Sequence, residues 1–591
     1  MGRLAAMVLP TLLCVACGQV YRPVVIPCSS GGVPGCPVQT PPTPGSFHAV
    51  FGLSTNVPSY PGGALQIDVS GDAIIAETPT SDKSVPTHAA ILPNLARLFV
   101  ASAGTVVSGG VDVVSSFTPS FQSTFSTGFG PVTAISLPSQ TSSISAISEV
   151  GNTVTVTLTA PLTNVAAGYA IVIAGVAIPG CNEPACNPLA YDGTFALISV
   201  NATTIQYTNP ASGLPPLSGG TASVPPQPVF LNSTQNNAVY VANYNSNSVF
   251  ALNANLNVVS NSALVGAHPV SLAETPNGSK IYVANQGDNT VSSLNTTGLS
   301  SNVVTGFSGV TPVWVVARGD SQKVYVLTQG DGKLVTIDTA TDTANTPDCS
   351  VTPTLCVGAG ANFIFYDPHL NRLYVTNPST SMVYVFSDTG GANDTPVQLK
   401  AISFASGTAP CPTTSATTTT GCLPTSVTAL PDGSRFYVAS YQVASPCPDP
   451  NVTVSPCVIP GLTVFDANSL TPKITPALTL LTWPPPPTIG QFAPNQFAVP
   501  PVASCAPAPL YSPGSTRFRV FTTAAADSSH VYVSMCDAGA FAVINTTNSN
   551  TNDSGGGTPA DTLITDLPAA FSGPSQAGEP SQNPIFMLSG Q

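Results

Sequence analysis

The chain has 591 residues, of which only 7% are charged, and its formal net charge is −13. A surface that binds phosphate needs clustered Lys and Arg, so the composition excludes nucleic acid and anionic lipid headgroups as expected partners. Hydrophobic residues make up 43% of the chain and the mean hydropathy is +0.27, which favours short strands joined by neutral turns over charged amphipathic helices.

The first 17 residues, MGRLAAMVLPTLLCVAC, have a positive start at Arg3 and then a short apolar run. That run is too short to span a bilayer comfortably and is typical of an export signal. Its end resembles a bacterial lipoprotein box, although Cys14 stands where Leu is usual, and this resemblance implies lipidation of Cys17. An ordinary cleaved signal, and hence a secreted protein, is the alternative. We interpret the Pro- and Gly-rich residues 18–46 as a tether.

Cysteine usage also indicates export. After Cys14 and Cys17, twelve of the 14 Cys remain, an even number that predicts disulfides in an oxidising compartment. The expected pairs are Cys28/Cys36, Cys181/Cys186, Cys349/Cys356, Cys411/Cys422, Cys447/Cys457 and Cys505/Cys536. The pairs are not CxxC and no His stands at ligand spacing, so we expect no metal site.

A short pattern recurs along the chain: an apolar stretch with a Tyr or Phe, a small polar turn, and a second apolar stretch. The copies are RLFVASAGTVVSGGVDVV, AVYVANYNSNSVFALN, KIYVANQGDNTVSSLN, KVYVLTQGDGKLVTID, RLYVTNPSTSMVYVFS, RFYVASYQ with GLTVFDAN, and HVYVSMCDAGAFAVIN. Where the spacing is most regular, it is about 42 to 49 residues. Such a period with strand-like segments is the signature of a β-propeller, in which each unit is one blade.

The copy RLYVTN at residues 372–377 contains the namesake tetrapeptide of the YVTN family of β-propeller repeats, which the chain closely resembles from about residue 47 to 590. The resemblance implies an all-β, extracytoplasmic propeller, and with the lipoprotein-like start it implies the cell envelope of a Gram-negative bacterium. Seven units are clear and a weaker one lies at 48–78. We favour eight blades over seven, with PIFMLSG at 584–590 supplying the strand that the weak unit lacks and closing the ring.

The blades are assigned to residues 47–138 and 225–591, separated by an insertion at 139–224 with its own alternating strands, such as NTVTVTLT, which predicts a small β-sandwich or barrel. In a four-stranded blade, the d–a and b–c connections meet at one end of the propeller. This insertion and most of the Cys-containing loops fall in those connections. Loops held on a rigid scaffold commonly carry recognition, so the asymmetry predicts a binding face.

Ionisable residues give little basis for catalysis, and no cofactor is expected. His88, His268 and Trp314 lie near the predicted channel mouth on the crowded face, and Arg318 and Glu274 could pair inside the channel, although structural roles suit all five. No nucleophile elbow, HExxH, haem attachment or phosphate loop is present. The sequence therefore favours a non-enzymatic scaffold that binds a protein, glycan or cell-wall partner. A propeller enzyme of lactone-hydrolase or oxidoreductase type is the alternative.

Overall fold

The computed structural model describes residues 49–55, 62–69, 72–80, 85–94, 97–103, 110–115, 133–163, 165–176, 191–392, 394–411, 418–419, 421–473, 497–513, 515–547, 560–568 and 582–589. The predicted signal and tether, with Cys17, Cys28 and Cys36, lie outside these residues, as do Cys181 and Cys186. Within the described residues, no helix is long and apolar enough to cross a membrane.

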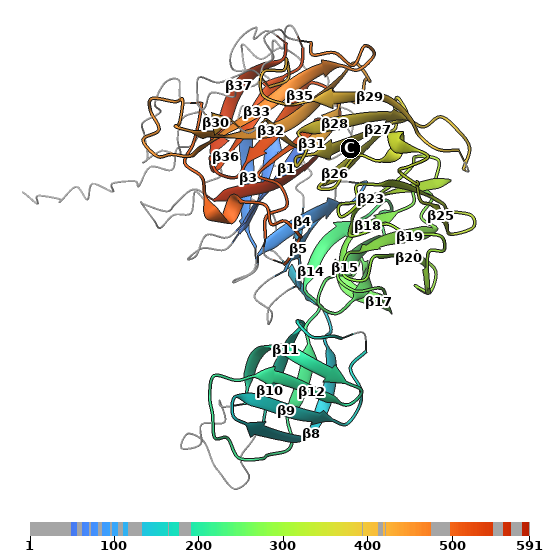
Figure 1. Ribbon diagram of the computed structural model, residues 1–591, viewed down its shortest axis with the longest axis vertical. Helices are drawn as coiled ribbons and strands as arrows, with labels where there is room; N and C mark the ends of the chain where they lie inside the picture. The colour runs from blue at the N-terminus through green and yellow to red at the C-terminus, as the bar shows by residue number, and fades with distance from the viewer. Residues whose placement is uncertain are drawn as a thin grey trace, which may run out of the picture.

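Eight antiparallel sheets surround a central axis as the blades of a propeller (Figure 1). We number the blades along the ring and give their strands from the innermost, a, outwards. Blade 1 comprises β38 (Asn583–Ser589), β1 (Ala49–Thr55), β2 (Gly63–Asp68) and β3 (Ala73–Pro79), and blade 2 comprises β4 (Pro86–Ile91), β5 (Arg97–Ser102), β6 (Gly110–Ser115) and β7 (Thr133–Ser136). Blade 3 comprises β14 (Pro228–Asn232), β15 (Ala238–Asn243), β16 (Ser248–Asn253) and β17 (Val258–Leu264), and blade 4 comprises β18 (Pro269–Glu274), β19 (Lys280–Asn285), β20 (Thr290–Asn295) and β21 (Ser301–Val303).

The remaining four blades follow in chain order. Blade 5 comprises β22 (Pro312–Ala317), β23 (Lys323–Thr328), β24 (Leu334–Asp338) and β25 (Thr343–Asn345), and blade 6 comprises β26 (Phe363–Asp367), β27 (Arg372–Asn377), β28 (Met382–Ser387) and β29 (Val397–Ser403). Blade 7 comprises β31 (Leu423–Ala429), β32 (Arg435–Ser445) and β33 (Cys457–Asp466), with the short β30 (Thr418–Thr419) on the end of β32. Blade 8 comprises β34 (Val520–Ala524), β35 (His530–Met535), β36 (Ala540–Asn545) and β37 (Thr562–Pro568).

The repeated YVAN-like segment forms strand b of each blade, and its apolar character has a packing cause. Neighbouring blades cover both faces of the strand, so nearly every residue in it is buried, as in β19 and β27. The central aromatics Tyr282, Tyr325 and Tyr374 are fully buried between blades. The eight innermost strands contact one another in turn and close the ring, so the prediction of eight blades is confirmed.

The two ends of the chain close the ring together. The C-terminal strand β38 pairs antiparallel with β1, bringing Leu588 opposite Phe51 and Met587 opposite Gly52. Blade 1 therefore takes its innermost strand from the C-terminus and its other three strands from the N-terminal part, as the sequence predicted. This closure leaves no open blade edge between the first and last units.

The insertion forms a closed six-stranded barrel that projects beside blade 3 (Figure 1). Its strands are β8 (Gln140–Val150), β9 (Thr153–Leu158), β10 (Ala170–Ala174), β11 (Gly193–Asn201), β12 (Thr204–Thr208) and β13 (Thr221–Val224). The alternation that marked the insertion places Val154, Val156 and Leu158 inside a core separate from the propeller core. Of the two predicted alternatives, the module is a barrel.

In six blades, a basic side chain at the start of strand b contacts the c–d turn of the following blade. Lys280 and Tyr282 both bind Asp342, at 2.9 and 2.5 Å, and Arg435 and Tyr437 both bind Asp561, at 3.1 and 2.5 Å. Equivalent contacts join Lys323 to Asp388, Arg97 to Asn257, Arg372 to the carbonyl of Ala467, and His530 to Asp72. These contacts, which we call interblade anchors, fasten blades at the end that carries the short turns.

Candidate functional site

The d–a and b–c connections meet at one end of the propeller, which we call the braced face because its loops hold the disulfides. Three bonds lie within single connections: Cys349–Cys356, Cys411–Cys422 and Cys447–Cys457. The fourth joins Cys505, in the d–a connection before β34, to Cys536, in the b–c turn after β35. These four predicted pairs are confirmed, and they indicate an oxidising, exported location.

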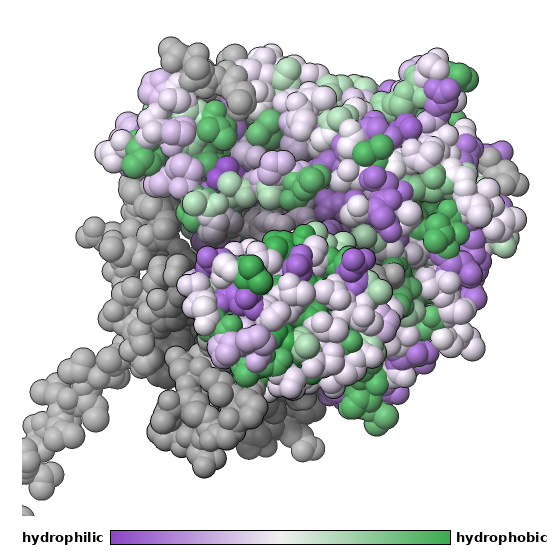
Figure 2. All heavy atoms as spheres, turned by 60° about the horizontal axis from the view of Figure 1, so that its bottom comes forward, coloured by the Kyte–Doolittle hydropathy of each residue, from purple (hydrophilic) through white to green (hydrophobic). Residues whose placement is uncertain are grey.

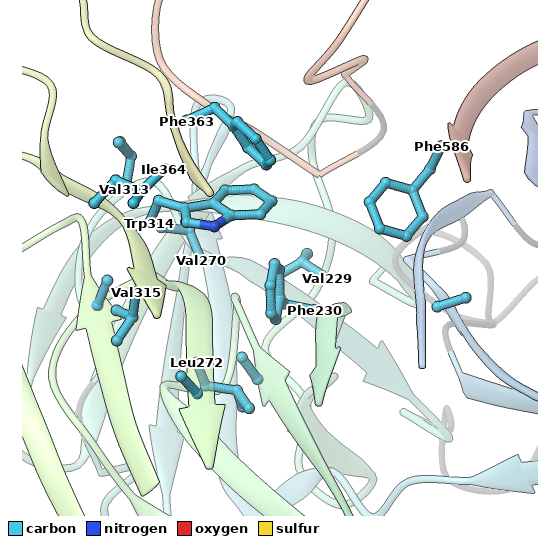
Figure 3. Close-up of a cluster of buried hydrophobic side chains, with 14 of the residues drawn as sticks. Val229, Phe230, Val270, Leu272, Val313, Trp314, Val315, Phe363, Ile364 and Phe586 are labelled. Atoms are coloured by element: carbon cyan, nitrogen blue, oxygen red, sulfur yellow. The ribbon is translucent and has the colours of Figure 1, made fainter. Parts of the chain in front are cut away.

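Aromatic side chains from the inner strands surround the channel on the braced face and define its mouth. Four inner strands begin with Pro, and in each the register shifts so that the residue two positions later sits at a bulge. In three of the four strands that residue is an aromatic: His88, Phe230 or Trp314. Phe363, Phe521 and Phe586 come from further inner strands, and Figure 3 shows four of the rings turned toward a common region.

The mouth is packed rather than open, because its rings contact one another around the axis. His88 stacks on Phe230 with ring centroids 3.8 Å apart, and the centroids of Trp314 and Phe363 are 4.9 Å apart. The ring continues from Phe521 to Phe586, at 4.7 Å, and back to His88, at 4.4 Å. Edge-to-face and offset pairs of this kind stabilise an aromatic cluster by about 0.5–1.5 kcal/mol each beyond burial.

Residues 515–519, just before β34, fill the centre of this ring, and we call them the plug. Phe518 is 3% exposed and contacts Trp314, Phe363 and Phe521, with centroid distances of 5.0 to 5.6 Å. The plug is tied to blade 8 by Arg519, whose guanidinium forms an ion pair with Asp537 at 2.7 Å. The Cys505–Cys536 disulfide joins the same connection to blade 8 before the plug begins. The segment 505–519 is therefore attached to blade 8 at both of its ends.

Arg517 is the cation of the mouth. Its guanidinium lies 4.1 Å from the ring centre of Tyr511 and 5.5 Å from those of Phe230 and Trp314, and it donates a hydrogen bond to the carbonyl of Val270. Burial lowers the pKa of His88 well below its ordinary value, and the nearby charge of Arg517 lowers that pKa further. His88 is therefore a neutral imidazole, and Nδ1 accepts a 3.4 Å hydrogen bond from the amide of Leu231.

A second aromatic series leads from the mouth to the barrel. Tyr511 contacts Tyr244 at 6.3 Å, Tyr244 stacks on His268 at 4.2 Å, and His268 contacts Tyr169 of the barrel at 4.6 Å. Asn245, in the b–c turn of blade 3, bonds both the amide and the carbonyl of Ala170 at 2.9 and 3.1 Å. These side-chain contacts, in addition to the two linkers, hold the barrel on the braced face.

The five predicted channel residues take different positions. His88 and Trp314 lie together in the mouth, 6.4 Å apart, whereas His268 lies at the contact with the barrel. Arg318 and Glu274 do not pair: Arg318 binds Asp320 and Asp388, and a Glu274 oxygen accepts the amide of Thr234 at 2.6 Å. Both stand near the ends of their inner strands, away from the mouth, because side chains there bond the turns of neighbouring blades.

Sequence reasoning missed Tyr511, Arg517 and Phe518. They lie in a Pro-rich connection with no repeat register, so nothing in the local pattern placed them on the axis. One feature of the sequence could have indicated their position. The predicted pairing of Cys505 with Cys536 places this connection next to blade 8. Among the described residues, no group of three or more His, Cys, Asp or Glu could hold a metal ion.

Exposed aliphatic side chains also occur in the braced-face connections. Val351 and Val454 lie inside two disulfide loops and are 75% and 44% exposed, while Val310 and Leu510 are 45% and 57% exposed. In Figure 2, which brings the barrel forward, apolar and hydrophilic residues are interspersed among residues of intermediate hydropathy. The connections of this face therefore present separate apolar side chains among polar residues that include Asp288, Asp331 and Asp348.

Comparisons with known proteins assign no family to the chain. No family model matches the sequence, and no curated protein matches it. Similar solved structures include a periplasmic gluconolactonase from Pseudomonas aeruginosa, with 12% identity and a TM-score of 0.39 over 92% of this chain and 99% of that one.

Two further solved structures are similar to the chain. Hydrazine synthase from Kuenenia stuttgartiensis shows 14% identity and a TM-score of 0.37 over 58% of this chain and 87% of that one. Sqt1 from Saccharomyces cerevisiae shows 8% identity and a TM-score of 0.42 over 83% of this chain and 86% of that one. At these identities and TM-scores, none of the three carries an argument about function.

Proposed function

We propose that the chain is an exported, non-enzymatic scaffold that binds a protein partner of the cell envelope through its braced face. The observation that carries this proposal is the placement of all four described disulfides in the d–a and b–c connections. Covalent bracing reduces the entropy that a loop loses on binding, and a rigid loop therefore binds more tightly.

The side chains of this face favour a protein over a glycan. Val310, Val351, Val454 and Leu510 are exposed aliphatics, which pack into apolar pockets on protein partners, whereas sugar rings stack on exposed aromatics. The described aromatics of the mouth are largely buried in the packed ring. Nucleic acid does not fit this face, because its described residues include only three that are basic: Lys333, Arg517 and Arg519.

The enzyme alternative needs, at the channel mouth, an acid or base whose pKa lies near the working pH. The described mouth supplies a guanidinium and a neutral imidazole, and the carboxylate of Asp537 is already engaged by Arg519. This arrangement offers aromatic packing rather than the paired carboxylates or His–carboxylate pairs of hydrolytic sites. We therefore retain the scaffold as the proposed function.

We further propose a lipid anchor at Cys17, with the tether 18–46 holding the propeller at the envelope of a Gram-negative bacterium, as the YVTN and lipoprotein-like resemblances imply. Metabolic labelling with palmitate tests this proposal in the native host. Label is expected on the intact protein and none on Cys17→Ser. Labelling of the variant, or no labelling of either protein, would contradict the anchor.

The binding proposal is tested by capture from envelope extract with matched variants. Val351→Asp combined with Val454→Asp introduces charge at two exposed loop positions on the braced face, and recovery of a specific partner should fall at least about tenfold. Leu256→Asp is the matched control, because Leu256 is 69% exposed in the c–d turn of blade 3 at the opposite end. Equal loss in both proteins, or loss in the control alone, would contradict a binding role for the braced face.

A further inference from the structure

The three described basic residues of the braced face differ in their partners. Lys333 forms an ion pair with Asp331 at 3.0 Å, and Arg519 forms one with Asp537 at 2.7 Å. Arg517 has no carboxylate within 4 Å among the described residues. In a chain with a net charge of −13, a cation that no described acid neutralises is notable, since acids outnumber bases 27 to 14.

The surroundings of Arg517 fix its direction while leaving hydrogen-bond donors available. A guanidinium carries five N–H donors. Arg517 donates to the carbonyl of Val270 and also lies within reach of the hydroxyl of Tyr511. Tyr511, Phe230 and Trp314 lie around its planar group and hold it by cation–π contact. As a residue Arg517 is partly exposed, and burial lowers the pKa of its guanidinium.

A second polar group in the same place lacks a hydrogen bond. The hydroxyl of Tyr511 is buried and has no hydrogen-bond partner among the described residues, although Arg517 and Thr87 lie close to it. A buried hydroxyl without a partner costs about 1–3 kcal/mol. The preceding residue, Leu510, is one of the exposed aliphatics of the braced face. Leu510 thus adjoins in sequence the tyrosine whose ring contacts the Arg517 guanidinium.

We propose that Arg517 binds a carboxylate that the protein partner presents at the channel mouth, with the body of the partner packing on Leu510. This inference rests on the proposed function and names the chemistry by which the partner is recognised. Guanidinium and carboxylate match as a planar, bidentate pair. A phosphate group carries a charge of about −1.5 to −2 and three acceptor oxygens, which would need donors beyond the single cation found here.

A carboxylate can come from a chain terminus or from an acidic side chain, and small probes separate the two sources. N-acetyl-phenylalanine represents a C-terminal carboxylate with an apolar body, and N-acetyl-aspartate N-methylamide represents a side-chain carboxylate. N-acetyl-phenylalaninamide is the neutral match to the first. Trp314 lies in the mouth beside Arg517, so its fluorescence in a Trp483→Phe background reports binding.

Titration of the full chain should give saturable binding of at least one acid and at least tenfold weaker binding of the neutral amide. Arg517→Met should lose this preference, and Arg517→Lys should keep part of it, because Lys retains the charge without the planar fork. Lys333→Met is the matched control, since it removes another cation of the same face, and it should bind as the unaltered chain does. The thermal unfolding temperature of each variant shows that the protein is folded.

Equal affinity for acid and amide, or an unchanged preference in Arg517→Met, would overturn the inference. The proposed function has a separate readout in partner capture. If Arg517→Met captures the partner normally while Val351→Asp with Val454→Asp does not, the carboxylate site is wrong and the binding face stands. If neither variant affects capture, both proposals fail.

Discussion

At the scale of single residues, Lys323 and Asp388 show how the blades are fastened. Lys323 is fully buried at the start of β23, and its ammonium lies 2.9 Å from both oxygens of Asp388 in blade 6. Tyr325 donates to the same carboxylate at 2.7 Å, and Arg318 approaches it at 3.3 Å. Buried charges are tolerated only when they are paired and hydrogen-bonded, and one carboxylate here satisfies three donors from blade 5.

We expect Asp388→Asn to lower the free energy of unfolding by about 3–5 kcal/mol, because it leaves buried cations without a counter-charge. Asp320→Asn is the control, since Asp320 also binds Arg318 but its side chain is 44% exposed, and it should cost about 1 kcal/mol or less. Urea unfolding measures both. Similar losses in the two variants would mean that burial does not set the strength of this anchor.

Asp566, on the outer strand β37, gives a pH dependence of known sign. Burial raises its pKa to about 8, while the unfolded chain loses the same proton near pH 4. Between these values the folded state holds a proton that the unfolded state has released, so stability falls as pH rises through this window. Asp566→Asn should therefore raise the unfolding temperature at pH 8.5 and change it much less at pH 5. An equal change at both pH values would contradict the raised pKa.

At the scale of elements, strand b could be predicted from the sequence and its partners could not. The aromatic and the basic residue two positions before it recur in register, which marks the strand and its start. The acidic partners of Lys280 and Arg435 lie 62 and 126 residues further on. The partner of His530 is Asp72, in blade 1 near the start of the chain. Only the fold shows that Lys280 and Arg435 perform the same task. The same limitation hid the plug, which has no repeat to align.

Removing the Cys505–Cys536 disulfide tests whether this bond positions the plug. Replacing Cys505 and Cys536 by Ser opens a loop with a sequence separation of 31, which in the chain-entropy model costs about 3–4 kcal/mol. Because Phe518 contacts Trp314, we also expect Trp314 fluorescence to change in the Trp483→Phe background.

The disulfide Cys447–Cys457 supplies the control for that experiment. It closes a loop with a sequence separation of 10, in the b–c connection of blade 7. Its replacement by Ser should cost roughly 2–3 kcal/mol and leave Trp314 fluorescence unchanged. An unchanged spectrum after loss of Cys505–Cys536 would show that this bond does not position the plug.

At the scale of the whole molecule, composition, period and the C-terminal strand sufficed to predict an eight-bladed ring with an inserted β module. The four described disulfides also followed from the spacing of the Cys residues. The seating of the barrel did not, because Tyr169, His268 and Asn245 meet across segments with different patterns. Arg318 and Glu274, for which a pair in the channel was one possibility, do not pair. Each side chain instead binds a turn that strand periodicity does not describe.

The barrel should be separable from the ring. Gln140 and Val224 are cross-strand partners, so the chain leaves and re-enters the module at adjacent points and a short Gly-Ser linker can replace 140–224. Because the barrel has a core of its own, we expect the shortened propeller and the isolated barrel each to unfold cooperatively in calorimetry. A propeller that fails to fold without the barrel would show that the contacts of Asn245 and His268 stabilise the ring itself.

The most direct test of the binding face is site-specific photo-crosslinking in the native host. A photoreactive amino acid is placed at Val351, Val454 or Leu510 on the braced face, and at Leu256 on the opposite end as the control. We expect one discrete protein adduct from the three braced-face positions and none from Leu256. Adducts from Leu256 alone, or equally from both ends, would contradict a single recognition surface built on the disulfide-braced connections.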